Sequence, residues 1–152
     1  MSQEIDPDLP HHTTLEVRDR CLCLQAQRAA RALARRFDQA LKPVGLTNGQ
    51  FSMLMALNRP EPPRISDLAP FLAMDRTTAT AAVKVLERRG LIDVEPDPDD
   101  RRNRRLRLSN DGIDLLKQAV PIWRETHDAL DAVLGEVDQD ALKSGLSAVA
   151  RS

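Results

Sequence analysis

The stretch from Ile65 to Leu108 constrains the fold of this chain more than any other part of its sequence. Apolar residues recur every three or four positions in its first half, and this spacing predicts two consecutive helices. Ser66 is predicted to cap the first helix and Asp75 the second. A side-chain oxygen at such a position can accept hydrogen bonds from the free N–H groups of the first helical turn.

The second of these helices has two chemically different faces, one of small apolar residues and one of threonine, lysine and arginine. Gly90 is expected to end it, because the position after a helix often needs a positive φ. Strands are expected over 91–95 and 106–108, joined by a polar turn, and the run 101–107 holds five arginines and no acid. Helix, turn, helix and basic hairpin are the order of a winged helix-turn-helix. In that fold the second helix enters a DNA major groove and the hairpin tip reaches a minor groove.

Helical patterns flank this module on both sides. One helix of about 27 residues, roughly 40 Å long, is predicted within residues 14–42, and further helices are predicted over 110–150. Their apolar faces exceed what one small module can bury. This excess predicts a homodimer whose recognition helices lie about one DNA turn, roughly 34 Å, apart. The expected fold is a single winged-helix domain over 1–152, mainly α with a small β-hairpin wing, with dimerisation helices around a DNA-binding module at 47–108.

The composition fits a soluble globular protein, with 30% charged and 41% hydrophobic residues. The net charge is −1, so any basic surface must be local, and the 3% aromatic content disfavours binding of single strands by base stacking. Residues 1–12 are polar and are expected to form a loose arm without a signal peptide. No apolar run approaches the roughly 20 residues of a membrane span. The two cysteines follow no disulfide framework, which favours a cytoplasmic location.

The chain resembles the MarR family of bacterial transcriptional regulators from about Leu15 to Leu146. The segments GLTNGQFSMLMAL, ISDLAPFLAMDRTTATAAVKVLERRGLI and DPDDRRNRRLRLSNDG carry the resemblance. It implies a dimeric winged-helix protein that binds palindromic operators, usually represses, and is usually released by a small molecule or an oxidant. It also implies that Asp100 and Arg102 are the acid and the arginine of the wing tip, with Arg102 in the minor groove.

The predicted DNA contacts of the second helix follow from its side chains. Arg76 can reach a guanine edge, Thr77 or Thr80 can touch a base or a phosphate, and Ala81 can meet a thymine methyl group. The lysine and arginine further along suit phosphates, which position a protein without reading sequence. The alternative is an ordinary helix with a solvated face. The full predicted DNA-binding set is Ser66, Arg76, Thr77, Thr78, Thr80, Ala81, Lys84, Arg88, Asp100, Arg101, Arg102 and Arg104.

The wing arginines, with Arg105 among them, are predicted to enter or line a minor groove, where the potential is most negative over A·T-rich steps. Asp99 and Asp100 would repel phosphate if they were free. They are therefore predicted to orient an arginine through a charge-assisted bond. The alternative for this segment is a solvated charge run.

Two further sets of residues have weaker predicted roles. Cys21 and Cys23 are predicted on one helix, where residues two apart point about 200° apart, so no unstrained disulfide is expected between them. Core or interface packing is the simpler interpretation, and a peroxide-sensing Cys23 is the alternative. Trp123, with Phe37 and Phe51, is predicted either to pack in the core or to line an effector pocket.

The predicted function is a dimeric, sequence-specific DNA-binding transcriptional regulator, a repressor released by a small-molecule effector. The alternatives are a winged-helix module that binds protein and not DNA, or a thiol-based peroxide-sensing regulator. No enzyme is expected, because the sequence has no nucleophile–base constellation and no glycine-rich phosphate loop. No metal or other cofactor is expected, since the histidines have no second ligand at metal spacing. The expected partners are an operator duplex, a second copy of the chain and an unidentified small molecule, and no membrane.

Overall fold

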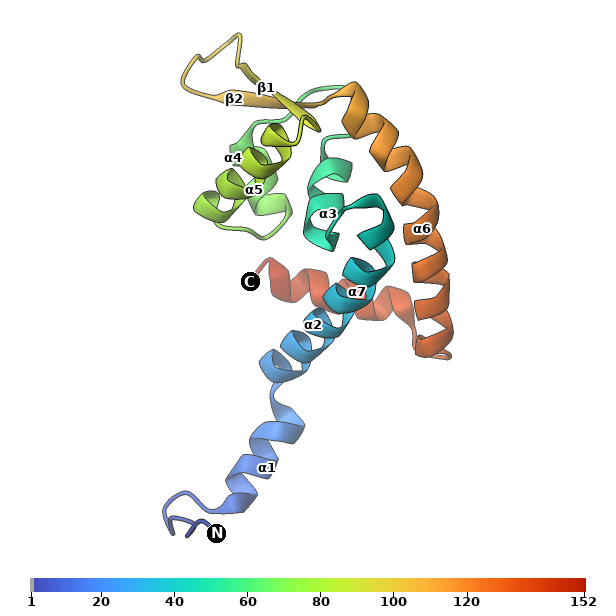
Figure 1. Cartoon of the computed structure of the whole chain (residues 1–152). Coiled ribbons are helices and arrows are strands. Elements are labelled where there is room, and N and C mark those ends of the chain that lie inside the picture. Colours follow the sequence, from blue (N-terminus) through green and yellow to red (C-terminus); the bar gives the residue numbers. More distant parts are fainter. Residues whose placement is uncertain (1) are drawn as a thin grey trace. The chain divides into compact units, whose positions relative to one another are not determined.

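The structure, a computed structural model, describes residues 2–152 (Figure 1). The chain divides into two compact units, with the boundary in the sequence between Arg36 and Phe37. The elements in order are α1 (His11–Arg20), α2 (Leu22–Leu41), the 3-10 helix η1 (Lys42–Val44), α3 (Asn48–Ala56), α4 (Ile65–Phe71), α5 (Arg76–Arg88), β1 (Ile92–Pro96), β2 (Arg104–Leu108), α6 (Asn110–Leu134) and α7 (Gln139–Ala150). The chain is mainly helical with one antiparallel hairpin, which confirms the predicted fold class.

The N-terminal unit corrects the prediction of one long helix beginning at residue 14. α1 begins at His11, inside the segment expected to be a loose arm, and the helix is interrupted at Cys21, whose backbone is extended with ψ 102°. The Sγ atom of Cys21 accepts a hydrogen bond from the Leu24 N–H at 3.3 Å, so a thiol serves as the N-terminal cap of α2. No glycine or proline lies at the break, so the spacing of apolar residues predicted a continuous helix through Cys21.

The start of α4 also differs from the prediction. Arg64 is the N-cap, and the carboxylate of Asp67 accepts the Arg64 backbone N–H at 3.0 Å. Ser66 therefore lies inside the first turn with its side chain exposed, and the prediction that it caps the helix is wrong. The reason is local, because an acid three residues after Arg64 can satisfy the backbone N–H of the cap.

The recognition helix α5 has the ends that the sequence predicts. Asp75 caps it, with its Oδ1 accepting the Thr78 N–H at 2.8 Å. Gly90 has a φ of +73°, the left-handed conformation that lets the chain leave the helix. β1 begins two residues later and pairs with β2 in a register that sets Val94 opposite Leu106. The helix-turn-helix and the hairpin are therefore confirmed.

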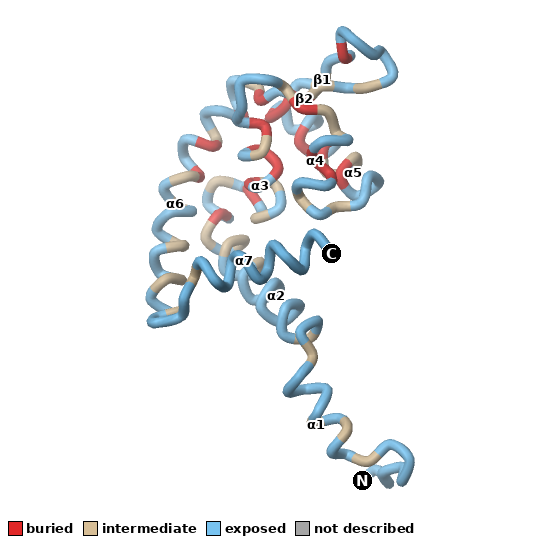
Figure 2. Tube along the Cα trace, turned by 180° about the vertical axis from the view of Figure 1, so that it is seen from behind, coloured by how far each residue is buried: buried red, intermediate tan, exposed pale blue. Residues whose placement is uncertain are grey.

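The hydrophobic core of the second unit lies where α3, α4, α5 and the base of the hairpin meet (Figure 2). Leu54, Leu68, Leu86 and Leu106 are fully buried, and each comes from a different one of these elements. Burying a leucine side chain contributes about 1.5–3 kcal/mol. This packing therefore holds the recognition helix and the hairpin in one body.

The terminal helices bury little of their apolar surface. α1 and α7 have no buried residue, and Leu22 and Val133 are exposed over 76% and 67% of their surface. Leu142, Leu146 and Val149 recur on α7 at helical spacing and are also exposed. Within residues 2–152 no helix combines the length and the apolar character that crossing a bilayer requires.

α6 approaches the segment before β1 closely at Gly112. Ser109 caps α6, with its Oγ accepting the Gly112 N–H at 3.0 Å and donating to the Gly90 carbonyl at 2.6 Å. A Cβ atom on Gly112 would lie 2.1 Å from the Leu91 carbonyl oxygen, well inside van der Waals contact. Only glycine fits here without movement of the backbone.

We expect Gly112→Ala to destabilise the fold by about 1–3 kcal/mol, because the added methyl group must displace a backbone carbonyl. Urea unfolding followed by circular dichroism would measure the change. Gly49→Ala is the matched control, since no atom lies within 4 Å of its added Cβ, and it should change stability by less than about 0.5 kcal/mol. Equal stabilities of the two variants would contradict the close approach.

Candidate nucleic-acid interface

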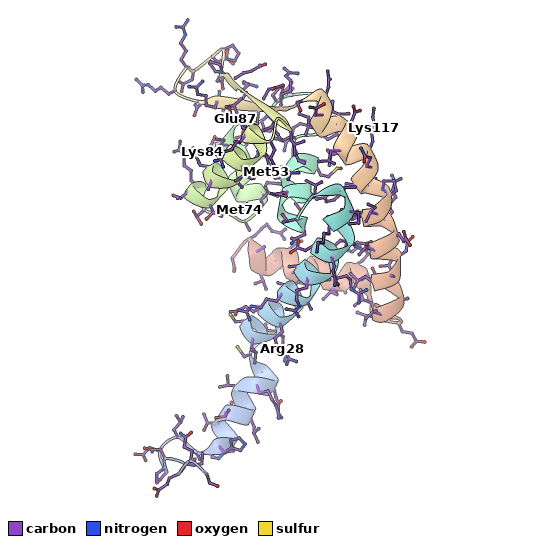
Figure 3. The ribbon with its side chains drawn as sticks, in the orientation of Figure 1. Arg28, Met53, Met74, Lys84, Glu87 and Lys117 are labelled. Carbon is purple, nitrogen blue, oxygen red and sulfur yellow. The ribbon has the colours of Figure 1, made fainter. Side chains whose placement is uncertain are left out.

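The exposed face of α5 carries a shallow hollow of about 390 Å³. The opposite face of the same helix is buried through Ala79, Val83 and Leu86. Lys84 projects from α5 on the outer side (Figure 3). The hollow is lined by Arg76, Thr77, Thr80, Ala81 and Lys84, all of which belong to the predicted DNA-binding set. The fold thus gathers two cations, two hydroxyl groups and a methyl group on one concave surface.

Two other predicted residues of α5 lie outside this hollow. The Thr78 hydroxyl donates to Asp75 Oδ2 at 2.6 Å, so Thr78 takes part in the cap of the helix. The hydrogen bonds from the Thr78 hydroxyl and backbone N–H lower the pKa of Asp75. Arg88 is exposed in the last turn, four residues after Lys84. Ser66 is exposed on α4 and does not line the hollow either.

The carboxylate of Asp100 shapes the tip of the hairpin through the backbone. Its Oδ1 accepts the Arg102 N–H at 3.0 Å, and its Oδ2 accepts the Asn103 side-chain amide at 3.1 Å. The prediction that Asp100 binds a guanidinium group is therefore wrong, because its two oxygens bind a backbone N–H and a side-chain amide. Arg101, Arg102 and Arg104 are exposed, and among residues 2–152 no carboxylate forms an ion pair with them. These three arginines are the accessible cations near the tip of the wing, and Arg107 is a further exposed arginine on β2.

The loop that joins β1 to β2 begins with a buried carboxylate, Asp97, which is not among the residues predicted from the sequence. Its Oδ2 accepts a hydrogen bond from Arg64 Nε and lies 3.3 Å from Arg105 Nε, while its Oδ1 accepts the Asp99 N–H at 2.9 Å. The pKa of Asp97 lies below its ordinary value. The hydrogen bond from the Asp99 N–H is the largest cause, burial of the carboxylate acts in the opposite direction, and the nearby Arg64 and Arg105 lower the pKa further. No local pattern marks this residue, because Arg64 is 33 positions away in the sequence.

Arg105 is therefore used differently from the prediction. Its guanidinium group contacts Asp97, donates to the Pro62 carbonyl at 3.3 Å and lies 3.7 Å from Asp99. Its side chain is only 27% exposed. Asp99 was predicted to orient an arginine through a charge-assisted bond. It lies within ion-pair distance of Arg105, but no hydrogen bond joins the two side chains, and Arg105 faces the inside of the wing and not its free surface.

A groove of about 500 Å³ is lined by residues of α3, α4 and α6. The rings of Phe51 and Trp123 stack at its wall with centroids 6.2 Å apart, and Arg124 adds a cation. The Trp123 ring also lies 5.0 Å from His127, whose ring is 6.3 Å from Phe37. Phe37 does not line the groove, so the three predicted aromatic residues form a row of which two reach the groove.

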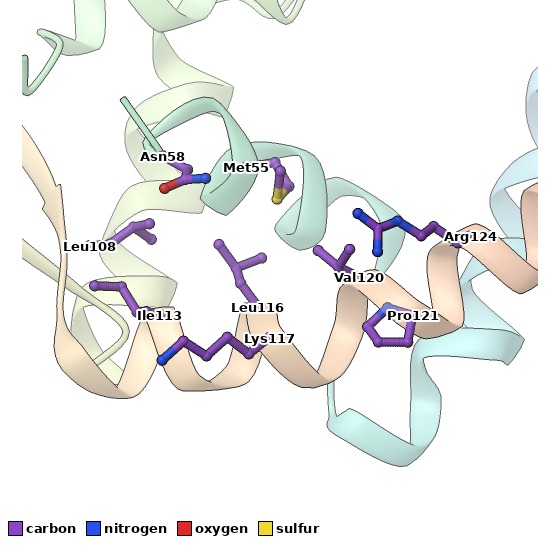
Figure 4. Close-up of a pocket in the computed structure, with 9 residues that line it drawn as sticks. All are labelled: Met55, Asn58, Leu108, Ile113, Leu116, Lys117, Val120, Pro121 and Arg124. Atoms are coloured by element: carbon purple, nitrogen blue, oxygen red, sulfur yellow. The ribbon is translucent and has the colours of Figure 1, made fainter. Parts of the chain in front are cut away.

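A second hollow of about 350 Å³ continues along α3 and α6 (Figure 4). It shares Met55, Val120 and Arg124 with the first groove. Lys117 and Pro121 of α6 stand along its edge (Figure 4). Proline donates no backbone hydrogen bond, so α6 lacks one i→i−4 bond at this wall.

The two cysteines occupy different local structures. Cys21 lies in the break before α2, whereas Cys23 is on α2 and exposed, with its Sγ accepting from Gln27 Nε2 at 3.0 Å. The premise that both cysteines lie on one helix is therefore wrong. Both are free thiols, and a sensing role for Cys23 stays a prediction.

A helix-turn-helix followed by a hairpin with exposed arginines defines a winged-helix protein. The MarR family matches residues 46–103. The transcriptional repressor MprA of Escherichia coli strain K12 is 30% identical over 138 residues, which cover 90% of this chain and 75% of MprA. The transcriptional repressor NicR of Pseudomonas putida is 34% identical over 89 residues, or 59% of this chain and 56% of NicR, so this match spans little more than half of that relative.

A solved structure of a transcriptional regulator is also similar to this chain over most of its length. The transcriptional regulator MosR of M. tuberculosis, crystallised in complex with DNA, is 34% identical, with a TM-score of 0.78 over 86% of this chain and 94% of MosR. The chain belongs to the MarR family of winged-helix transcriptional regulators.

We expect Asp97→Asn to destabilise the fold in a pH-dependent manner. The pKa of Asp97 is lowered in the folded state. Its charge therefore stabilises the fold above the unfolded pKa of about 3.9, and this stabilisation is lost as the pH falls through the folded pKa. The difference between wild type and variant should be constant from pH 7 to pH 5 and shrink in more acidic solution. Urea unfolding at a series of pH values would measure it, with exposed Asp93→Asn as the control. A difference that persisted unchanged at the most acidic pH would contradict this role of the charge.

Proposed function

We propose that this chain is a homodimeric, sequence-specific DNA-binding repressor whose affinity for its operator is controlled by a small molecule. The hollow on α5 is the observation that supports this proposal most. It presents Arg76, Thr77, Thr80, Ala81 and Lys84 on the face of the recognition helix that the core leaves free. A protein-interaction module has no need for such a cationic face with a basic wing beside it.

The major-groove contacts would divide by chemistry. Arg76 has a planar fork that can bind the O6 and N7 atoms of guanine, and Ala81 is small enough to meet a thymine methyl group. Thr80 donates its hydroxyl hydrogen to the Arg76 carbonyl at 2.8 Å, so its oxygen remains as an acceptor for a base amino group. Lys84 and Arg88 would bind phosphates, which set the register of the helix on the duplex.

The wing would add minor-groove contacts through Arg101, Arg102 and Arg104. An arginine that enters a narrow minor groove gains from its negative potential without reading individual bases. The turn formed by Asp100 fixes the backbone of Arg102, which is where the family resemblance places the minor-groove residue.

A second copy of the chain would cover the apolar faces of the terminal helices. Leu142, Leu146 and Val149 form an exposed stripe on α7, and Val133 is exposed near the end of α6. Burial of such surface is the main favourable term in protein association. A twofold dimer would present two recognition helices to the two halves of a palindromic operator.

The effector would occupy the groove at Phe51, Trp123 and Arg124. Its volume of about 500 Å³ lies within the range of small-molecule sites, roughly 300–1,000 Å³. Stacked rings with one cation suit a flat, apolar molecule that carries a negative group. Because Trp123 is the only tryptophan, its fluorescence would report occupancy directly.

We expect Arg102→Ala to weaken binding to an operator selected from genomic fragments and to reduce the salt dependence of that binding. Each lost phosphate contact lowers the slope of log K against log salt by about one. Fluorescence anisotropy at several salt concentrations would measure both quantities. Exposed Arg28→Ala on α2 removes one positive charge elsewhere and is the control. An affinity and a slope unchanged by Arg102→Ala would contradict the role of the wing, and a wild type that ignores duplexes at low salt would contradict the proposed function.

Arg76→Ala and Lys84→Ala should separate base reading from phosphate binding. Loss of a bidentate base contact costs about 1–3 kcal/mol on the operator and much less on a scrambled duplex. Arg76→Ala should therefore lower the ratio of the two affinities, whereas Lys84→Ala should lower both affinities by a similar factor. Competition binding with the two duplexes measures the ratio. If Arg76→Ala reduced both affinities equally, Arg76 would not be reading a base.

A further inference from the structure

Asp97 connects three segments that meet where the loop of the wing, residues 97–103, leaves the two strands. Arg64 is the N-cap of α4, Arg105 lies on β2, and Asp99 lies in the turn between the strands. All three contact the same buried carboxylate, Arg64 and Asp99 by hydrogen bonds and Arg105 as an ion pair. One side chain thus joins the helix-turn-helix to both sides of the hairpin.

The backbone around this carboxylate is tied in the same way. The Leu106 N–H donates to the Pro63 carbonyl at 2.9 Å, and Arg64 forms an isolated β-bridge with Arg105. The Asp97 N–H donates to the Asn103 carbonyl at 3.0 Å and closes the turn. The segment before α4 therefore runs beside β2, and the wing leaves the body of the protein in a fixed direction.

The charges at this site have different exposure from those at the tip. Arg64 and Arg105 are 35% and 27% exposed, whereas Asp97 is fully buried between them. Removing one member of a buried charged cluster leaves the others unpaired, which favours rearrangement. Without the carboxylate, both guanidinium groups would turn toward water and release the loop end of the hairpin from the segment before α4.

Two DNA-contacting surfaces on one protein strengthen each other's binding only if both can contact the same duplex at the same time. Here the surfaces are the hollow of α5 and the exposed arginines of the wing tip. We propose that Asp97 is a positioning residue for DNA binding, which sets the direction of the wing so that Arg102 reaches the duplex while α5 occupies the neighbouring groove. This inference rests on the proposed function.

A double-mutant cycle between Asp97 and Arg102 tests the proposal. Asp97→Asn should weaken operator binding about tenfold in the wild-type background but less than about twofold in an Arg102→Ala background, because a wing without its arginine gains nothing from being positioned. The substitution also makes the protein more positive, which by itself favours DNA binding. Asp93→Asn on β1 makes the same change of charge at an exposed site and is the matched control, with no expected loss of affinity.

Arg64→Gln provides a second variant if Asp97→Asn folds poorly. It breaks the link to α4 but leaves Asp97 bonded to Asp99 and beside Arg105. It should show the same dependence on Arg102. Circular dichroism and titration of active protein would show that each sample is folded, since partial unfolding would lower the active fraction equally in both backgrounds.

Hydrogen exchange provides a measurement that needs no DNA. In Asp97→Asn the amides of Asp99, Asn103 and Leu106 should exchange faster, while those in the centres of α3 and α5 keep wild-type rates at a temperature where the variant is folded. If wild type bound no duplex, the proposed function would fail, and this exchange pattern would still decide whether Asp97 holds the wing. An equal effect of Asp97→Asn in both backgrounds, no effect on affinity, or unchanged exchange in the wing would each overturn the proposal.

Discussion

The packing of four leucines from α3, α4, α5 and β2 is the constraint on which the rest of the structure depends. Leu68 of α4 and Leu86 of α5 belong to one hydrophobic core with residues of α3 and the hairpin. Rotation of α5 about its axis would therefore expose Leu86 and open this core. Its free face is therefore fixed as the one with Arg76, Thr80 and Lys84. A helix that was free to rotate would present no constant set of side chains to DNA. Burial of one face of the helix is therefore a condition for sequence-specific binding by the opposite face.

The charges of the chain are distributed locally and not in bulk. A net charge of −1 gives no attraction to a polyanion at long range, so affinity for DNA must come from short basic segments with few competing acids. The run 101–107 is such a segment, but the fold divides its arginines between two tasks. Arg105 faces Asp97 inside the wing, whereas Arg101, Arg102 and Arg104 remain exposed near the tip and Arg107 is exposed on β2. The same type of side chain supports the wing from inside and offers cations at its tip.

The features that could be predicted from the sequence are those set by neighbouring residues. Asp75 and Gly90 bound α5 as expected, because a cap and a positive φ each depend on a few adjacent positions. The break at Cys21 was missed because a cysteine in an extended conformation has no distinctive pattern. Asp97 was missed because its partner Arg64 lies far away in the chain, and only the folded protein brings the two together. All five residues that line the hollow on α5 belong to the predicted set, since helical spacing largely decides which residues share a face. Thr78 and Arg88 were predicted with them but do not line the hollow.

The short helix α4 links the two regions on which regulation would depend. Its N-cap Arg64 binds Asp97 at the start of the wing loop, while Phe71 at its other end lines the groove that Trp123 also lines. Seven residues of helix span only about 10 Å, so a displacement at one end reaches the other as a rigid movement. A ligand in the groove can alter DNA affinity only if it binds the two positions of α4 unequally. Linkage then requires DNA to weaken ligand binding by the same factor by which the ligand weakens DNA binding.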